Sequence, residues 1–171
     1  MTQYHDEPQG ETPPPEALRS AVDEGNRMIW LYANTNREFA GMGTTLVGAI
    51  LHDLQAYVIN IGDSRAYHIS EDEIRRVTRD HSVVEALVER GNLTPEQARQ
   101  HPQKNLITRA LGTSKTAEAD IFELTLAPGD WLLLCSDGLI NEVDDAEILA
   151  EIRHGNSPEE RCQNLLDTVL E

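Results

Sequence analysis

The sequence predicts an α+β protein in which strands come first, then a helical insertion, then more strands and finally helices. Short segments rich in Val, Ile, Leu and Thr follow one another between residues 44 and 77, separated by short polar turns. Residues 82–100 then have the apolar spacing of helices, and further strands and helices follow them. Consecutive strands without intervening helices favour antiparallel pairing over a repeated strand–helix–strand plan.

The N-terminal part divides into a lead-in and a helix. Residues 1–15 are polar and end in three consecutive prolines, which predicts a disordered or extended segment. From residue 16 to about residue 36, apolar or small residues recur at steps of three and four, so an amphipathic helix is expected there. Those positions are Leu18, Val22, Gly25, Ile29 and Tyr32.

The strands are expected in two groups. The first group forms an antiparallel meander that opens with a hairpin around His52 and Asp53. The second group flanks a turn of sequence Ala-Pro-Gly at residues 127–129. The predicted strands are residues 44–51, 55–61, 65–69, 73–77, 119–126 and 130–136.

Capping signals locate the later helices. Thr94 is followed by Pro at the first helical position and by Gln97 at the capping-box position, so a short helix is expected to begin there. Asp144 and Glu147 form a second such pair, before a helix that extends to about residue 153. Ser157 precedes a last helix that runs to the C-terminus.

Composition limits the classes of partner and compartment. The chain has 171 residues and a formal net charge of −16, from 30 acidic residues against 14 Lys and Arg. This balance argues against binding to nucleic acid or to an anionic membrane, because both need basic surface. Cys135 and Cys162 have no metal-ligand spacing, which favours the reducing cytoplasm. No apolar run reaches the length of a membrane span.

Three acidic residues follow predicted strands and are the candidate chemical groups. The apolar strand 130–136 leads directly into Asp137, and Gly138 allows a sharp turn beside this acid. Asp63 lies in the turn before the third strand, and Asp80 follows the fourth. Acids at such positions are often ordinary turn or capping residues. Strand ends can also converge on one rim of a sandwich, where clustered carboxylates bind Mg²⁺ or Mn²⁺.

Other catalytic patterns are absent from the sequence. It contains no nucleophile-elbow, Walker or dinucleotide-binding motif, and its six histidines have no zinc-ligand spacing. His81 directly follows Asp80, so a proton-transfer role and a structural hydrogen-bonding role both remain open.

Several short motifs, taken in order, resemble the metal-dependent protein phosphatases of the phosphatase 2C family, and the match is close to the bacterial branch. The resemblance covers roughly residues 17–170. It is carried by Gly41-Met42-Gly43-Thr44-Thr45, Ile61-Gly62-Asp63-Ser64-Arg65-Ala66-Tyr67, Asp80-His81-Ser82, Gly91, Thr94-Pro95-Glu96-Gln97-Ala98, His101-Pro102, Ile107-Thr108-Arg109-Ala110-Leu111-Gly112 and Cys135-Ser136-Asp137-Gly138-Leu139.

The resemblance implies a fold and an activity. The fold is an antiparallel sandwich flanked by helices, with a flap subdomain at about residues 83–105 that influences substrate choice. The activity is hydrolysis of phosphoserine and phosphothreonine in proteins, by a water that two Mn²⁺ or Mg²⁺ ions share. The implied partners are a phosphorylated protein substrate and the serine/threonine kinase that produces it.

The resemblance also implies residue roles. Asp137 matches a core metal ligand, and Asp80 matches the acid that holds a third ion together with it. Asp63 and Arg65 match a structural motif near the site, in which a local ion pair is expected to order the turn. Asn141 occupies a position where some members have an acid. His81, Ser82 and His101 are assigned to the flap.

Other family motifs have no counterpart in the sequence. The family has an N-terminal phosphate-binding Arg, a Glu-Asp pair and an Asp-Gly-Met-Gly-Gly segment, and a C-terminal Asp-Asn. Of the usual ligands of the two-ion core, only Asp137 is present. The domain is therefore expected to be incomplete at both ends, with the chain an internal portion of a longer phosphatase. The alternative is a catalytically inactive phosphatase-like module that binds a phosphoprotein or a regulatory partner.

Overall fold

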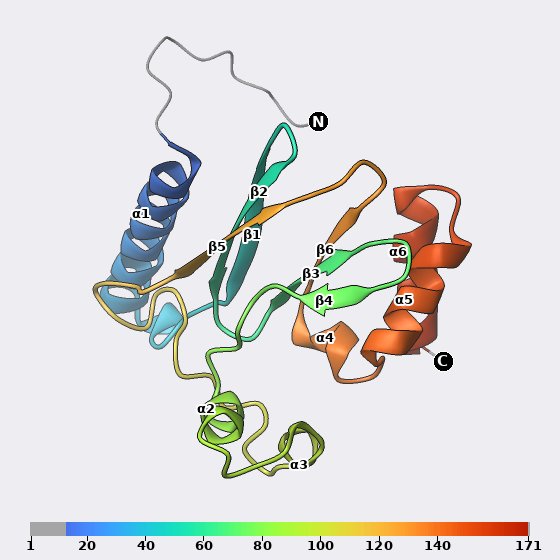
Figure 1. The fold of residues 1–171 in the computed structure, drawn as a ribbon. Coiled ribbons are helices and arrows are strands. Elements are labelled where there is room, and N and C mark those ends of the chain that lie inside the picture. Colours follow the sequence, from blue (N-terminus) through green and yellow to red (C-terminus); the bar gives the residue numbers. More distant parts are fainter. Residues whose placement is uncertain (1–12, 171) are drawn as a thin grey trace.

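The structure, a computed structural model, describes residues 13–170 and has four layers (Figure 1). Helix α1 (Pro14–Thr35) covers one side of a three-stranded sheet, and a second three-stranded sheet packs against the other side. Helices α5 (Asp145–His154) and α6 (Pro158–Leu170) cover the second sheet. This arrangement confirms the predicted antiparallel sandwich flanked by helices.

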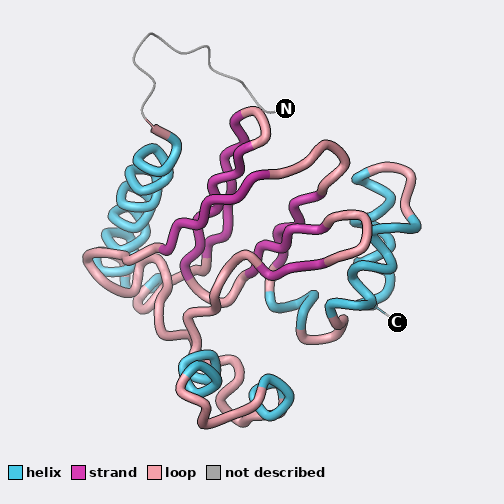
Figure 2. Tube along the Cα trace, viewed as in Figure 1, coloured by secondary structure: helices cyan, strands magenta, loops and turns pink. Residues whose placement is uncertain are grey.

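The strands, drawn in magenta in Figure 2, lie in two groups. Within the described residues, all strand pairs are antiparallel. The first sheet has the order β1-β2-β5 and the second β4-β3-β6. The predicted continuous meander is therefore wrong, because β2 and β3 follow each other in sequence but lie in different sheets. The strands are β1 (Leu46–His52), β2 (Gln55–Ile61), β3 (Arg65–Ile69), β4 (Ile74–Arg76), β5 (Asp120–Thr125) and β6 (Trp131–Cys135).

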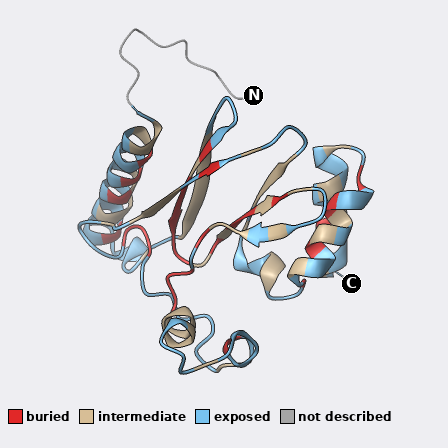
Figure 3. Ribbon diagram, in the orientation of Figure 1, coloured by how far each residue is buried: buried red, intermediate tan, exposed pale blue. Residues whose placement is uncertain are grey.

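Successive side chains of β2 point to opposite faces of the first sheet, so this strand packs against both α1 and the second sheet. Ala56 and Val58 face the second sheet, where they pack with Ala66 of β3. Ile59 and Ile61 face the opposite way and pack against α1. Small residues dominate the buried part between the sheets, so the two sheets can approach closely. The most buried segments lie in the centre of the molecule (Figure 3).

The helices follow the predicted signals with small shifts. Helix α1 begins at Pro14, two residues before the predicted start, because proline is compatible with the first helical turn. The expected lead-in otherwise lies in residues 1–12, outside the described residues. The capping box of Asp144 and Glu147 is confirmed, since the Asp144 carboxylate accepts hydrogen bonds from the N–H groups of Ala146 and Glu147.

The flap projects from one end of the sandwich as two short helices. These are α2 (Val83–Glu89) and α3 (Pro95–Arg99), separated by Gly91, which has a φ of +71°. The predicted Thr94–Gln97 capping box is present. Helix α3 is mostly exposed, and only Ala98 of its residues is buried.

Two short helices were not predicted. They are the 3₁₀ turn η1 (Arg37–Phe39) and α4 (Asp137–Ile140), which are too short to show an apolar period. Helix α4 matters for the site because Asp137 is its first residue. Among the described helices, none is long and apolar enough to cross a membrane.

Glycine substitutions test the packing. A Cβ on Gly25 of α1 would meet no atom within 4 Å, so Gly25→Ala is expected to stabilise the fold by about 0.5–1 kcal/mol. Gly62 has a φ of +106°, and its Cβ would lie 2.3 Å from Cγ2 of Thr45. We expect Gly62→Ala to cost more than about 1 kcal/mol.

Gly41→Ala is the matched control, because Gly41 has a φ of +80° but open space around a new Cβ. Urea unfolding should rank the midpoints as Gly25→Ala, wild type, Gly41→Ala and Gly62→Ala, from highest to lowest. Equal midpoints for Gly41→Ala and Gly62→Ala would mean that the close approach to Thr45 is unimportant.

Candidate active site

The predicted acids converge on one cavity beneath the flap. Asp63, Asp80 and Asp137 all line a cavity of about 270 Å³, together with Asp145 at the start of α5. Residues of α2, α3 and the segment after α3 form the facing wall. The cavity thus lies between the ends of the strands and the flap.

The register of the second sheet explains why two of these acids meet. Strands β3 and β6 are antiparallel, and Arg65 at the start of β3 pairs with Cys135 at the end of β6. The residues just before β3 and just after β6 must therefore lie at the same edge of the sheet. Asp63 precedes β3, and Asp137 follows β6.

Asp80 joins them through an ion pair with Arg65. Nη2 of Arg65 lies 2.6 Å from Oδ2 of Asp80, and Nε lies 2.9 Å from Oδ1. The Asp80 side chain is 8% exposed, so the pair is largely removed from water. The predicted local ion pair between Arg65 and Asp63 is wrong, because the guanidinium forms its ion pair with Asp80 and also donates to the Tyr67 hydroxyl.

The convergence of like charges shows in the pKa values. Burial raises the pKa of Asp63, and the nearby carboxylates of Asp137 and Asp80 raise it further. Burial alone would lower the pKa of Arg65, but the hydrogen bonds and the charge of Asp80 outweigh it and raise that pKa. Burial raises the pKa of Cys135 to about 11, so its thiol remains protonated at neutral pH and is a poor nucleophile.

The residues expected in or beside the flap occupy different places. Ser82 is the N-cap of α2, where its hydroxyl accepts a hydrogen bond from the Glu85 N–H. His101 follows α3, and its Nδ1 accepts from the Gln103 N–H. His81 is only 5% exposed and directly precedes Ser82, at the base of the expected flap.

Gly138 has a simpler role than expected. It is the second residue of α4 and does not have a positive φ. A Cβ there would meet Ser136 Oγ at 3.4 Å, which is ordinary contact. The chain turns after β6 by starting a helix, so this turn does not use the left-handed backbone conformation that glycine allows.

Several residues of the cavity were missed by the sequence. Asp145 is a fourth aspartate of the cavity. In the sequence, only its position beside the predicted cap Asp144 pointed to it. Arg99 and Lys104 add positive charge on the flap side. In the sequence, these two cations look like ordinary surface residues. Asn141 also lines the cavity, at the end of α4.

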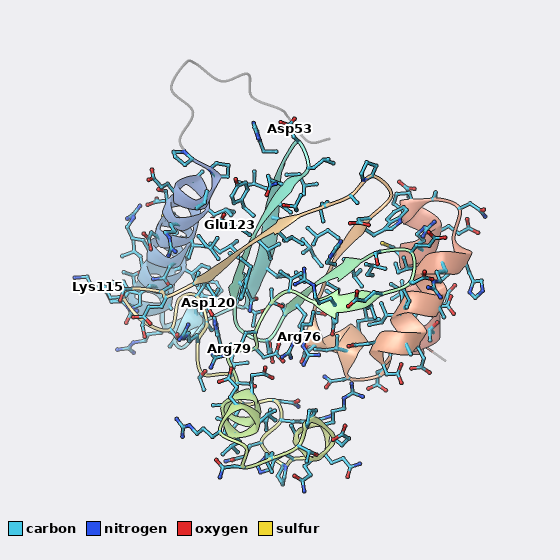
Figure 4. The ribbon with its side chains drawn as sticks, in the orientation of Figure 1. Asp53, Arg76, Arg79, Lys115, Asp120 and Glu123 are labelled. Atoms are coloured by element: carbon cyan, nitrogen blue, oxygen red, sulfur yellow. The ribbon has the colours of Figure 1, made fainter. Side chains whose placement is uncertain are left out.

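Ion pairs fasten the flap to the sandwich. Arg76 at the end of β4 pairs with Glu85 of α2, and Arg79 pairs with Glu89 of the same helix. Figure 4 shows Arg76, Arg79 and Asp120 at the end of the sheets that faces α2. The ion pairs join the segment that carries Asp80 to the first helix of the flap.

The described residues do not fit a complete two-ion centre. Within residues 13–170, there is no group of three or more His, Cys, Asp or Glu side chains placed to hold one ion. Both oxygens of Asp80 already accept hydrogen bonds from Arg65. Asp137 is exposed at the cavity and is the carboxylate most open to an ion.

Comparison with known proteins agrees with this fold and cavity. Residues 15–171 match the family model described as Stage II sporulation protein E. The chain is 44% identical over 131 residues to the serine/threonine phosphatase stp of Listeria innocua, covering 77% of this chain and 52% of that protein. It resembles the crystal structure of phosphatase Stp1 from Staphylococcus aureus, with a TM-score of 0.88 and 40% identity, covering 91% of this chain and 61% of that one.

A further similar structure is the catalytic domain of the serine/threonine phosphatase PstP in complex with two manganese ions. Its TM-score is 0.84 at 33% identity, and the match covers 96% of this chain and 67% of that one. Two packed antiparallel sheets with a carboxylate-lined cavity under a helical flap therefore define a phosphatase 2C-type domain. The chain belongs to this phosphatase family. It spans about half the length of the curated relatives it matches.

Replacement of Asp63 tests the cost of burying its charge beside other carboxylates. Because its folded-state pKa is raised, ionised Asp63 destabilises the fold above that pKa, and the cost disappears below the pKa of the unfolded chain. Asp63→Asn should therefore raise the melting temperature by a few degrees at pH 7 and have little effect near pH 3.

The control is Asp23→Asn, which removes one exposed acid of α1 and so makes the same change in net charge. Thermal unfolding followed by circular dichroism measures both variants at each pH. An equal gain in the two variants would show that global charge, not the cavity, is responsible.

Proposed function

We propose that the cavity is part of the phosphate-hydrolysing site of a metal-dependent protein phosphatase that acts on phosphoserine and phosphothreonine. The observation that carries this proposal is the convergence of Asp63, Asp80 and Asp137 on one cavity. That convergence occurs in a chain 40% identical to Stp1 with a TM-score of 0.88. Carboxylates repel a phosphate dianion, so a cation must lie between them for the phosphate to bind.

We propose Mn²⁺ or Mg²⁺ as that cation. The PstP structure with two manganese ions supports this choice, and so does the carboxylate chemistry of the cavity. When bound, such ions supply an activated water and neutralise phosphoryl oxygens. Asp137 is the proposed ligand of the core site in this chain, and Asp80 is the proposed ligand of a third ion. A third ion would have to share the Asp80 oxygens with Arg65.

The chain's own residues can position a substrate. Arg99 and Lys104 face the acids across the cavity and can pair with phosphate or with acidic residues beside it. Both come from the flap region, so flap position should influence which phosphopeptides enter. The proposed partners are a phosphorylated protein and the serine/threonine kinase that modifies it. The free Cys135 and Cys162 support a reducing cytoplasm as the proposed location.

The second candidate function is that of a catalytically inactive phosphatase-like module. It is favoured by one observation, the lack of a three-ligand group among the described residues. Such a module would bind a phosphoprotein or a regulatory partner through the same cavity. The two candidate functions make different predictions for a protein in which the missing metal-binding carboxylates are supplied. Only the phosphatase should then hydrolyse phosphopeptides.

A chimera tests the catalytic proposal. Residues 14–170 would replace the matching part of S. aureus Stp1, so that Stp1 supplies the segments that this chain does not match. We expect Mn²⁺-dependent hydrolysis of a phosphothreonine peptide, because the acidic residues in the Stp1 segments should complete the metal centre. Asp137→Asn in the chimera should reduce kcat by at least about 100-fold, since a core ligand is lost.

Asp23→Asn in the chimera is the control and should leave turnover unchanged, because Asp23 lies on the exposed side of α1. A folded chimera without hydrolysis would support the inactive module. Full activity of the Asp137→Asn chimera would contradict the ligand role of Asp137.

The 171-residue chain by itself should bind Mn²⁺ weakly. One open carboxylate and an ion-paired neighbour cannot replace the water shells of two hard ions. Isothermal titration should show no saturation below about 1 mM Mn²⁺. Phosphopeptide turnover should stay near background. Two tight ions in this chain would show that it carries ligands outside residues 13–170.

A further inference from the structure

His81 holds both polar groups of the Gly62 backbone. The His81 N–H donates to the Gly62 carbonyl oxygen at 2.8 Å, and Nδ1 of its ring accepts from the Gly62 N–H at 3.1 Å. The side chain of Asn60 also donates to the Gly62 carbonyl, at 3.3 Å. One residue therefore forms a two-point clamp on the glycine directly before Asp63.

The clamp requires one form of the imidazole ring. Because Nδ1 accepts a hydrogen bond, the proton of a neutral ring must be on Nε2. Nε2 lies 3.2 Å from Oδ2 of Asp120, which can accept that proton's hydrogen bond. Arg109 lies equally close to Nε2, but it has only donors, so its partner in this arrangement is Oδ1 of Asp120 at 3.1 Å.

Asp120 is suited to fix this ring form. Burial would raise its pKa, but hydrogen bonds and charge from His81 and Arg109 outweigh burial and lower it. The carboxylate is therefore ionised at neutral pH and accepts from both neighbours. Asp120 is the first residue of β5, so the ring is anchored to the first sheet.

The same clamp reaches both acids and the flap. Gly62 precedes Asp63, and His81 follows Asp80, so clamping the two backbones limits how far these carboxylates can separate. The His81 carbonyl accepts from the Thr108 N–H at 2.7 Å, on the segment that returns from the flap. Ser82, the next residue, caps α2. The two ends of the flap therefore meet at His81.

A direct role in proton transfer does not fit this geometry. Both ring nitrogens already have partners, and the ring is 5% exposed. Among the described residues that line the cavity, Asp80 and Ser82 are present but His81 is not. The open choice between a proton-transfer role and a hydrogen-bonding role is thus decided by burial.

We propose that His81 is a positioning residue that, in the Nε2–H form fixed by Asp120, clamps Gly62 and sets the separation of Asp63 and Asp80 at the base of the flap. The functional meaning of the clamp rests on the proposed phosphatase site, whereas the clamp itself is a property of the fold. Nuclear magnetic resonance of the 171-residue chain can therefore test it without any hydrolysis assay.

The first measurement is the ring form in the wild-type chain. Two-bond ¹⁵N–¹H correlation at neutral pH should show His81 with its proton on Nε2 and a bare Nδ1. The Gly62 and Thr108 amides should exchange slowly with deuterium. A proton on Nδ1 at neutral pH would overturn the proposal, because the Gly62 N–H would then face a donor.

Two matched variants distinguish the contribution of Nδ1 from that of Nε2. His81→Asn keeps an acceptor near the Nδ1 position and loses the contact with Asp120. His81→Gln reaches toward Asp120 and loses the acceptor for Gly62. We expect His81→Gln to speed Gly62 amide exchange about tenfold or more, the effect of one lost buried hydrogen bond, while His81→Asn stays close to wild type.

The carboxyl ¹³C signals of Asp63 and Asp80 should move in His81→Gln and be restored in His81→Asn. Exchange of the Tyr67 amide, in the buried strand β3, reports global opening and should be equal in both variants. Equal Gly62 protection in the two variants would overturn the proposal. If both variants unfold, Asp120→Ala replaces them, and it must populate the Nδ1–H ring form for the proposal to stand.

Discussion

The ion pair between Arg65 and Asp80 is the interaction on which the site depends. It joins the start of β3 to the segment that leads into the flap, with both oxygens of Asp80 held by one guanidinium. A buried carboxylate without such a partner would be costly, because it would lose its water without compensation. The ion pair with Arg65 supplies that compensation to Asp80, which lines the cavity together with Asp63 and Asp137. The strand ends and the flap base are thereby fixed to each other.

The remaining charge around the cavity is not balanced in the same way. Asp63, Asp137 and Asp145 share a small space with Asp80. Burial raises the pKa of Asp63, and the nearby carboxylates of Asp137 and Asp80 raise it further. Such a cluster favours the binding of a cation over its exclusion. The flap region contributes Arg99 and Lys104 to the cavity lining. An anion could therefore be held between a cation bound at the acids and these two side chains. The proposed recognition of a phosphate dianion fits this division between strand ends and flap.

Hydrogen bonds of the backbone connect the flap to the acids. The flap begins at the Ser82 cap and returns at Thr108, and both points adjoin His81. Ion pairs of Arg76 and Arg79 with α2 add a second attachment that is partly exposed and therefore weaker. A movement of the flap would act first on these outer pairs. The buried contacts of His81 are expected to persist, so that the acids keep their arrangement.

The sequence alone determined the strands and the main capped helices, because alternation, apolar spacing and capping residues are local signals. It also identified Asp63, Asp80 and Asp137, through their positions after strands and a family resemblance. Tertiary structure decided the rest. Whether Arg65 pairs with Asp63 or with Asp80 depends on the path between β4 and α2, and that path is set by long-range packing. Likewise, β2 and β3 separate into two sheets because their buried faces need different partners. The role of His81 depends on Gly62 and Asp120, which lie far from it in the chain, so no local pattern can reveal it.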